Sequence, residues 1–573
     1  MRRSLLLLAA LASCPLRAPA QEATVETVET VGAVGTVGTV GTVGTVGTVA
    51  SLEKVASLAT VASLEVRRFN VFTPEEAAKA FFPYRLANAL HFVTREWFVK
   101  RELLFAPGDP LDPELLAETE RVLRATPLFR SASVRDEGEG RVVVETADAW
   151  TLLPKGSFSR KGGKYAWSVG LEEQNLLGTG RGLSLLYDKG YDRLSRSVAY
   201  VDPQFVWPFT FFRIMASDLS DGRTFEARLA RPFYAFAAPW GAEGFFRNSL
   251  FDTKLYAAGN ETTVWKKSDR TLRVEGGWLQ ANHGAVALRP YLVSEWSDVT
   301  LAPGGLGPPP PAADDRKFLW LGGGIERAAL GWIVRRQVEQ IDRDEDFNIA
   351  LTGRADISAS PPFGDRTGVA VRARGAGSVG TLLPGGFALF SASGQARYAG
   401  EVQNIRFTAD ARAYSLAPPW TLIFHVGAAG GWRADPEVQY YLDPENGMRG
   451  YNLWAVAGTG RAVTNAEARL LLASDVLQLV SFAVVGFVDG GIAWGPPDGT
   501  WRLADVGVGL RLGLSRAAKN TVIRLDLSDA LHRDPQGRGG WLFSFSSGAA
   551  PGCVAAPGRE RGGGPSVLQP FSA

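Results

Sequence analysis

The residue types that most often perform catalysis or bind metals are sparse in this sequence. Cysteine occurs only at Cys14 and Cys553, so neither a structural zinc site nor a disulfide framework can be built. The histidines form no HxxxH or HxH pair, the spacings that let two imidazoles reach one metal ion; they are His91, His283, His425 and His532. We therefore expect no metal, no cofactor and no enzyme activity.

Three motif-like stretches approach catalytic or phosphate-binding patterns. Residues 376–380 read AGSVG; they lack the first glycine of G-x-S-x-G and lie in strand-like sequence, not at a strand–turn–helix. The stretches GTGRG (178–182) and GTGRA (458–462) do not open a helix, as phosphate-binding loops do, and predict hairpin turns. A hydrolase stays an alternative, but no cluster of a nucleophile with carboxylates supports it.

One short motif places an arginine between small residues. It consists of Gly447, Met448, Arg449, Gly450 and Tyr451. Two later strand-like segments carry the acids Glu467 and Asp489 on the face opposite their apolar side chains. If that face lines a barrel, an arginine and carboxylates inside it can form bidentate, charge-assisted hydrogen bonds. The alternative is an ordinary turn and two solvated acids.

Strands must position these residues. From about residue 155 to 548, apolar and polar side chains alternate with a period of two, as in 480–489, 521–528 and 541–546. One apolar and one mixed face is typical of a transmembrane β-barrel, and also of a soluble sandwich. The extent of the region, about 390 residues, its many aromatic residues and a preceding export signal favour the barrel.

The barrel prediction includes a strand number and a seam. At about 24 residues per strand the region allows about 16 antiparallel strands. Residues 296–318 contain a run of prolines, 308–311, and predict an exposed loop. The first and last strands are expected to meet at a weakly closed seam, because glycines loosen strand pairing. The residues expected there are Tyr165, Gly170, Gly540, Trp541, Phe543 and Phe545.

A small α+β domain precedes the barrel. Residues 86–93 predict a strand, and Thr94 can cap a helix that runs to Leu104. Asp112 caps a second helix with Pro113 at its first position. Two short strands follow at 131–135 and 141–146 around the turn 137–140. The order is therefore β-α-α-β-β. One face of the second helix carries Leu115, Leu116, Thr119, Val122, Leu123 and Thr126.

The two ends of the sequence differ from the rest. Arg2 and Arg3 precede an apolar run, and 18–20 (APA) forms a cleavage site, so residues 1–20 predict an export signal. A lipoprotein box ending at Cys14 is the alternative. Residues 21–65 contain VGT repeats and predict a low-complexity leader. We place the α+β domain with its lead-in at 66–154, the barrel at 155–548, and a disordered tail at 549–573.

Several segments resemble the BamA/TamA family of outer-membrane insertases, the bacterial surface antigen family. In the α+β domain, REWFVKRELLF, GDPLD, TPLF and SASVRD are similar to one POTRA repeat. At the start of the barrel, GLEEQNLLGTGRGLSLLY and YVDPQF are similar to the family's first hairpin and the segment after it. Residues 447–451 are similar to its (V/I)RG(F/Y) motif, with Met448 in place of the aliphatic residue.

The resemblance implies a fold, a site and a function. The motif would form the tip of a loop that folds back into the barrel. There Arg449 would meet the strands that carry Glu467, Phe487 and Asp489. The protein would lie in the bacterial outer membrane with a single POTRA domain in the periplasm. It would insert outer-membrane proteins or translocate proteins, by strand pairing at the seam and substrate binding by the POTRA domain.

Other readings stay open. A dedicated exporter of one secreted partner would share the fold but pass its substrate through the lumen, and a passive porin or structural barrel would do neither. The expected partners are outer-membrane lipid, unfolded outer-membrane or secreted proteins, and periplasmic chaperones or accessory lipoproteins. Nucleic acid is not expected, because 61 Lys and Arg face 59 Asp and Glu. The tail that contains Cys553 is a departure from the family, which usually ends on its last strand.

Overall fold

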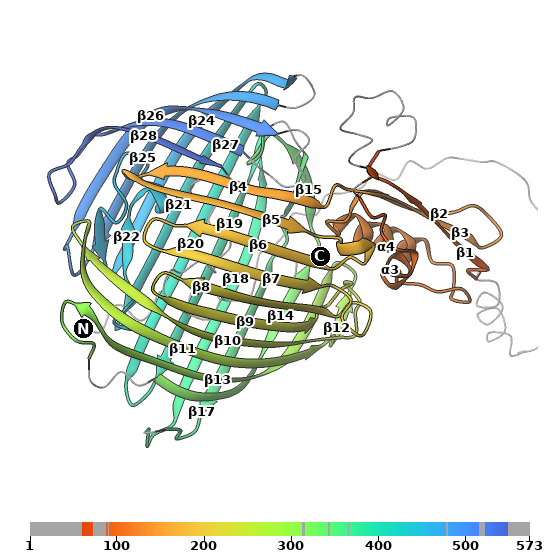
Figure 1. The fold of residues 1–573 in the computed structure, drawn as a ribbon, viewed down its shortest axis with the longest axis horizontal. Helices are drawn as coiled ribbons and strands as arrows, with labels where there is room; N and C mark the ends of the chain where they lie inside the picture. Colours follow the sequence, from red (N-terminus) through yellow and green to blue (C-terminus); the bar gives the residue numbers. More distant parts are fainter. Residues whose placement is uncertain are drawn as a thin grey trace, which may run out of the picture. The chain divides into compact units, whose positions relative to one another are not determined.

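The computed structural model describes residues 60–72, 88–89, 91–311, 316–341, 344–364, 366–476, 480–514 and 522–547. The predicted export signal, the leader up to residue 59 and the predicted tail lie outside these ranges. Within them, the chain forms a small α+β unit and a large antiparallel β-barrel (Figure 1).

The α+β unit is a three-stranded sheet with two helices. Its elements are β1 (Ser63–Phe69), α3 (Glu96–Arg101), α4 (Pro113–Ala125), β2 (Phe129–Asp136) and β3 (Arg141–Asp148). In the sheet, β3 lies in the middle, parallel to β1 and antiparallel to β2. The Asp112 side chain caps α4 by accepting a hydrogen bond from the Glu114 N–H at 2.9 Å. The helix buries Leu116 and Leu123 in the core of the unit.

The first strand of this unit is not the predicted one. The sequence predicts a strand at 86–93, but residues 88–89 are helical and 91–95 are irregular. The strand is β1, which begins inside the stretch predicted as leader and whose Leu64 and Val66 pack against the core. Its partner β3 lies far along the chain, and packing between distant segments outweighs local strand propensity.

The barrel is closed, and its wall has 20 strands, with the three-residue β12 as a short addition. The wall strands are β4 (Leu152–Lys161), β5 (Lys164–Glu173), β6 (Gly182–Lys189), β7 (Leu194–Asp202), β8 (Phe211–Leu219), β9 (Gly222–Arg231), β10 (Trp240–Ala257), β11 (Asn260–Trp278), β12 (Ala281–His283), β13 (Val286–Leu306), β14 (Arg316–Ala329), β17 (Thr352–Ser360), β18 (Ala370–Leu383), β19 (Gly386–Tyr398), β20 (Val402–Ala417), β21 (Trp420–Trp432), β24 (Gly460–Val476), β25 (Val480–Trp494), β26 (Trp501–Leu514), β27 (Val522–Ala530) and β28 (Gly540–Ser547). Two further hairpins are β15 (Trp332–Arg336) with β16 (Asp344–Asn348), and β22 (Tyr440–Leu442) with β23 (Val456–Gly458).

The predicted number of about 16 strands is wrong. That number assumed long connections, whereas several hairpins close in two residues, such as Gly162 and Gly163 between β4 and β5. Gly163 has φ +75°, a conformation that tight turns require and glycine adopts freely. Short turns leave more of the chain for strands than the sequence estimate allowed.

The predicted loop at 296–318 is also mostly strand. The strand β13 continues to Leu306, and β14 begins at Arg316. Among the described residues, β13 beyond Val299 pairs only with β11. Pro303 therefore occupies a stretch with a neighbour on one side, where a missing backbone N–H is tolerated. Of the described residues between these two strands, 307–311, which include the proline run, lie outside regular structure.

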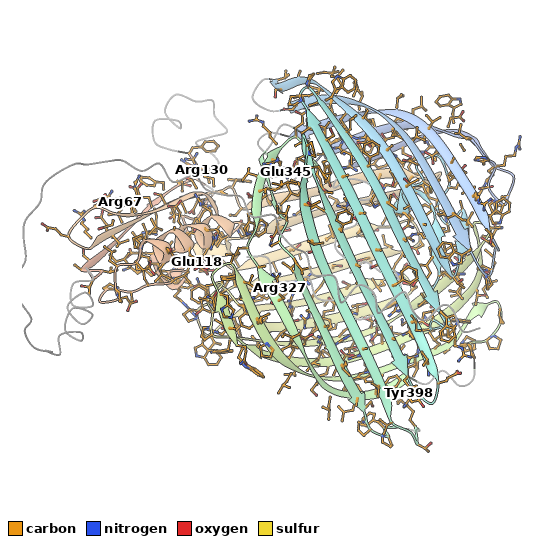
Figure 2. All side chains as sticks on the ribbon, turned by 180° about the vertical axis from the view of Figure 1, so that it is seen from behind. Arg67, Glu118, Arg130, Arg327, Glu345 and Tyr398 are labelled. Carbon is orange, nitrogen blue, oxygen red and sulfur yellow. The ribbon has the colours of Figure 1, made fainter. Side chains whose placement is uncertain are left out.

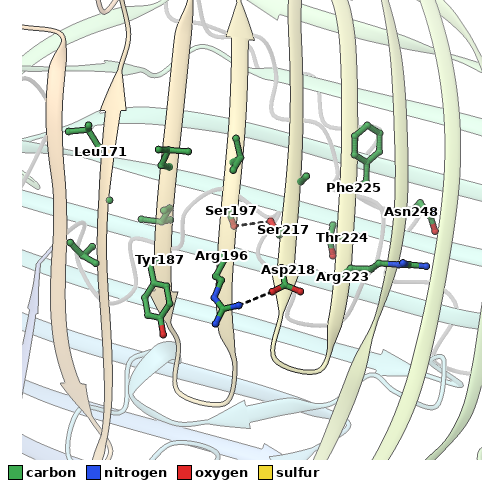
Figure 3. A pocket seen from close by; sticks show the side chains of 16 residues that line it. Leu171, Tyr187, Arg196, Ser197, Ser217, Asp218, Arg223, Thr224, Phe225 and Asn248 are labelled. Atoms are coloured by element: carbon green, nitrogen blue, oxygen red, sulfur yellow. Dashed lines mark hydrogen bonds and ion pairs between the residues drawn. The ribbon is translucent and has the colours of Figure 1, made fainter.

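The wall has an apolar and a polar face. Val169, Val198 and Phe225 are 55%, 49% and 41% exposed and line a shallow groove that extends from β5 to β10. Figure 3 shows this groove, with Phe225 and Asn248 labelled. The Arg196–Asp218 ion pair lies at the end of this groove beside the β6–β7 and β8–β9 turns. No helix of the described chain is long and apolar enough to cross a membrane.

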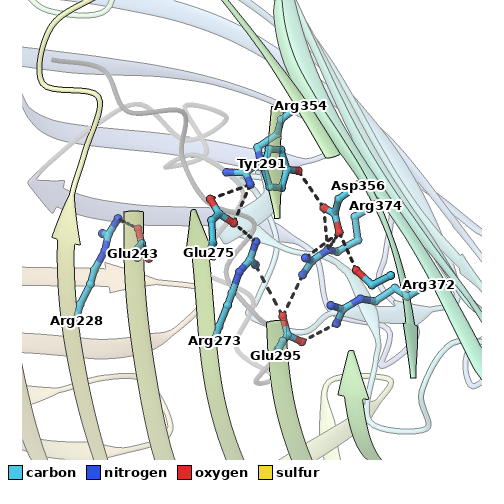
Figure 4. A network of polar contacts seen from close by, with 11 residues as sticks. Arg228, Glu243, Arg273, Glu275, Tyr291, Glu295, Arg354, Asp356, Arg372 and Arg374 are labelled. Carbon is cyan, nitrogen blue, oxygen red and sulfur yellow. Dashed lines mark hydrogen bonds and ion pairs between the residues drawn. The ribbon is translucent and has the colours of Figure 1, made fainter. Parts of the chain in front are cut away.

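The opposite face carries charged side chains and lines the lumen. There Glu295 accepts a hydrogen bond from Arg372 at 2.6 Å and contacts Arg374 at 3.3 Å (Figure 4). Arg374 also donates to Asp356 at 3.0 Å. Buried charges are stable only when they are paired, so these contacts indicate a lumen built from matched ion pairs, enclosed by an apolar outer surface.

Candidate functional site

A long connection between β21 and β24 folds into the barrel. Successive wall strands are antiparallel, so their turns alternate between the two ends of the barrel. The near end bears the β5–β6 turn, which contacts the α+β unit, and the far end bears the β4–β5 turn. Residues 433–459, here called the inner loop, start from the far end. The loop reaches β11, where Glu437 accepts a hydrogen bond from Lys267 at 2.9 Å, and β27, where Ser528 donates to the Arg449 carbonyl at 3.0 Å. It therefore crosses the lumen.

Arg449 at the tip of the inner loop is held by two carboxylates. Its Nε and Nη2 donate to the two oxygens of Asp489, each at 2.7 Å. Its Nη1 donates to Glu467 at 2.6 Å. The guanidinium carbon lies 3.4 Å from the ring centroid of Phe487, a cation–π contact. Arg449 is 5% exposed and Asp489 is fully buried, so water does not screen this interaction.

The strand register explains how the wall presents these partners. On neighbouring strands, Glu467 is opposite Phe487 and Asn465 is opposite Asp489. Asn465 and Glu467 are two residues apart on β24, and Phe487 and Asp489 are two residues apart on β25, so each pair lies on one face of its strand. The Asn465 amide donates to both the Gly447 carbonyl and Asp489, each at 2.7 Å. All the residues expected to meet Arg449 thus lie together, with Asn465 as an additional contact.

Small residues let the loop tip approach the wall. A Cβ atom on Gly450 would lie 2.6 Å from the Cβ of Asp505 on β26, closer than atoms pack. Gly447 has φ +102°, a left-handed conformation that favours glycine. Met448 and Tyr451 are buried in the same cluster, and the Tyr451 hydroxyl donates to the Ala504 carbonyl at 2.8 Å. The motif therefore contacts the barrel wall through close packing as well as through the charge of Arg449.

Residues that the sequence analysis did not single out complete the site. Asp505 is fully buried and is the register partner of Asp489. Arg469 and Arg511 both contact Glu467, at 2.6 and 3.3 Å. The signal that could have found them was the same alternation, since each lies on the lumen face of its strand. In the described part of the chain, no group of three or more His, Cys, Asp or Glu side chains is placed to hold a metal ion.

The seam joins β28 to β4, not to the strand that was predicted. Tyr165 and Gly170 lie on β5, the second strand of the wall, so their assignment to the seam is wrong. The strand β4 is not predicted by alternation, because its residues, LLPKGSFSRK, do not alternate cleanly. Gly540, Trp541, Phe543 and Phe545 lie on β28, as expected.

The seam is the least paired junction of the wall. Among the described residues, β28 and β4 share one pair of register partners, Phe545 and Arg160. Every other junction between the 20 main wall strands has at least seven such pairs. Side chains add to the closure, since Arg160 donates to the Phe543 carbonyl at 3.1 Å and Phe158 lies 6.0 Å from the Phe545 ring. Few backbone hydrogen bonds therefore have to break for the two strands to part.

The α+β unit contacts the near end of the barrel through buried polar groups. The Asn175 amide, in the β5–β6 turn, donates to the Thr94 hydroxyl at 2.9 Å. Thr94 in turn donates to Asp148 through its backbone N–H at 2.7 Å. Burial raises the pKa of Asp148 to about 6. A second contact joins Gln204, in the β7–β8 turn, to Glu102, whose pKa is also raised by burial.

The chain was compared with known families, proteins and structures. No family model matches it, and no curated protein matches it. Among solved structures, it is similar to BamA from Haemophilus ducreyi lacking POTRA domains 1–3, with 11% identity, a TM-score of 0.39 and 85% of each chain covered. It is also similar to CdiB from Acinetobacter baumannii, with 12% identity over 79% of this chain and 71% of that one and a TM-score of 0.36. A third similar structure is CdiB from Escherichia coli, with 12% identity over 85% of this chain and 76% of that one and a TM-score of 0.39.

Proposed function

We propose that this chain is an outer-membrane β-barrel of the BamA/TamA type that inserts other outer-membrane proteins. Unpaired backbone groups at a strand edge seek partners, and pairing through the backbone tolerates many sequences. An incoming strand would pair with β4 or β28 after they separate. The observation that carries this proposal is that, among the described residues, the seam has a single register pair, Phe545 with Arg160.

The lengths of the wall strands support insertion at the seam. The strands β27, β28 and β4 to β9 have 8 to 10 residues, whereas β10, β11 and β13 have 18, 19 and 21. Eight residues tilted by about 45° span only about 19 Å, against an apolar band of about 25 Å. Lipid adjusts to a short wall by thinning. A thinner bilayer beside the seam would lower the barrier to insertion.

The other parts take supporting roles in this proposal. The contacts of Arg449 with Asp489 and Glu467 hold the inner loop across the lumen and brace β24 and β25. The α+β unit would be a POTRA domain in the periplasm, where it binds unfolded outer-membrane or secreted proteins together with chaperones or accessory lipoproteins. The proposal assigns no catalytic step and no cofactor to the chain.

A reversible lock of the seam tests the proposal. In a background with Cys14 and Cys553 replaced by serine, Arg160→Cys with Phe545→Cys places two thiols on register partners, a spacing that a disulfide can bridge. The matched control is Ser157→Cys with Ser168→Cys, which joins β4 to β5 away from the seam. The assay follows folding of a substrate barrel into liposomes that contain the full-length protein.

Oxidation of the seam pair should abolish the acceleration over bare lipid, and reduction should restore it. Oxidation of the control pair should leave the acceleration intact. If the oxidised seam variant inserts substrate as fast as the reduced one, strand pairing at the seam is wrong.

A dedicated exporter is the second candidate function, and the width of the barrel favours it. A barrel's diameter grows with its strand number, and the wall has 20 strands. In that case the substrate would pass through the lumen, and locking the seam would not stop export. Loss of one secreted protein on depletion, with other barrels unaffected, would support the exporter.

A further inference from the structure

A second segment folds into the barrel, from the opposite end to the inner loop. Residues 330–341 and 344–351, here called the near-end hairpin, lie between β14 and β17 and contain β15 and β16. Arg327 and Glu345 lie at one end of the barrel and Tyr398 lies at the other (Figure 2). The inner loop starts from the far end and the near-end hairpin from the near end, so the lumen receives a segment from each side.

The turn of the near-end hairpin is held in shape from within. The Glu345 carboxylate accepts hydrogen bonds from the backbone N–H groups of Val338, Glu339 and Gln340, at 2.9, 3.0 and 3.2 Å. Charge-assisted bonds of this kind are strong. Gln337 adopts φ +63°, which is rare for a residue other than glycine. The turn is therefore a preformed unit that can dock as a whole.

Apolar contacts fix this turn against the wall. Val338 is fully buried with Phe387 on β19 and Tyr414 on β20. Farther on, Ile341 packs with Ala483 on β25 and Val522 on β27. The hairpin is connected to β14 and β17, whereas Ile341 near its turn packs against β25 and β27. The hairpin therefore extends past the intervening wall strands from β18 to β24. The segment therefore covers part of the near mouth of the barrel.

Polar contacts and a glycine also hold the near-end hairpin against the barrel wall. The Glu339 carboxylate accepts hydrogen bonds from Arg412 at 3.1 Å and from the Tyr414 hydroxyl at 2.8 Å. Thr421 donates to the Gln337 carbonyl at 3.0 Å. A Cβ atom on Gly513 would lie 2.7 Å from the Cβ of Ile341, so the wall has room for the hairpin only because this residue is glycine.

One arginine joins the near-end hairpin to the site of the inner loop. Arg469 Nη1 donates to the Val338 carbonyl at 2.7 Å, and its Nε donates to Glu467 at 2.6 Å. The other oxygen of Glu467 accepts the hydrogen bond from Arg449. Glu467 and Arg469 are two residues apart on β24 and share its lumen face. A continuous series of buried contacts thus runs from the tip of the inner loop to the near-end hairpin.

We propose that the near-end hairpin is a plug at the near mouth of the barrel, coupled to the inner loop through Glu467 and Arg469. Removal of Arg449 leaves the buried Glu467 with one fewer charge-assisted hydrogen bond, and Arg469 must then re-pair in part with it. That change weakens the bond from Arg469 to Val338, so release of the loop loosens the plug. Coupling of this kind requires a physical series of contacts with two arrangements. The inference concerns gating and does not depend on which protein is moved.

The test measures labelling of Val338→Cys by a water-soluble maleimide, in the full-length protein in liposomes with Cys14 and Cys553 replaced by serine. Val338 is fully buried, whereas Val334 on the same hairpin is 56% exposed. Val338→Cys should therefore react slowly and Val334→Cys rapidly. Adding Arg449→Ala should speed the labelling of Val338→Cys at least about fivefold, the lower range of allosteric coupling. Arg433→Ala is the matched control, because Arg433 forms an exposed ion pair with Glu401 in the same loop region.

A reciprocal experiment covers a failure of Val338→Cys to fold. Coupling free energies act equally in both directions, so Glu345→Ala, which removes the internal bonds of the hairpin, should speed the labelling of Ala455→Cys in the inner loop by a similar factor. Ala455 is fully buried. If Arg449→Ala exposes Ala455→Cys but leaves Val338→Cys unchanged, the coupling is overturned. If Val338→Cys reacts as fast as Val334→Cys without any further change, the plug itself is overturned. Neither outcome depends on the insertion assay.

Discussion

Replacing Arg449 with alanine should release the inner loop. The change removes three charge-assisted hydrogen bonds, two to Asp489 and one to Glu467, and the stacking on Phe487. It leaves the fully buried Asp489 without its main cation. Removal of one partner from a buried ion pair costs about 3–5 kcal/mol. Because about 1.4 kcal/mol is a factor of ten, the population of the released loop should rise roughly 100- to 4000-fold.

Labelling of a buried cysteine reports that population. Ala455→Cys adds only a sulfur atom at a fully buried position of the inner loop. Its reaction with a water-soluble maleimide requires local opening, so the rate follows the open fraction. Thr500→Cys, at an exposed position of the turn between β25 and β26, controls for access of the reagent. Arg449→Lys keeps the charge but not the two-pronged geometry, and should give an intermediate rate.

The reasoning would be refuted by a small effect. If Arg449→Ala changes the labelling of Ala455→Cys less than threefold while Thr500→Cys is unaffected, apolar packing of Met448 and Tyr451 holds the loop. In that case Met448→Ala should produce the release instead. A double-mutant cycle with Asp489→Ala separates the two, since an ion pair makes the second substitution less costly than the first.

Two predictions concern the α+β unit. Because the pKa of Asp148 is raised from 3.8 to about 6, the folded unit favours the neutral carboxyl, and its stability falls as the pH rises from about 4 to about 6. Asp148→Asn should remove this loss of stability, which is at most about 3 kcal/mol at 1.36 kcal/mol per pKa unit. Hydrogen exchange of β3 should then be slower in the variant than in the unchanged protein at pH 8, but not at pH 4. Equal exchange rates of the two proteins at pH 8 would contradict this prediction. A Cβ atom on Gly180 would lie 2.1 Å from the ring of Phe98, so Gly180→Ala should expose α3 to trypsin. Gly138→Ala, with φ +100° but nothing within 4 Å, should leave α3 as resistant as before.

The sequence contained enough information for the type of fold and for the polar site. Alternation with a period of two predicted strands, and the closed antiparallel wall confirms a mainly β barrel. The same alternation placed Glu467 and Asp489 on one face, and the cap formed by Asp112 and Pro113 located α4. These features depend on neighbours within a few residues, so local patterns suffice to find them.

Features that depend on distant partners were beyond the sequence. The number of strands depends on turn lengths, and β1 is a strand because it pairs with β3. The first wall strand, β4, has no clean alternation and is not predicted by it. The near-end hairpin lies inside the barrel because Gly513 makes room for Ile341 and Arg469 reaches Val338. Contacts between residues so far apart leave no periodic signal along the chain, and only closure of the wall brings them together.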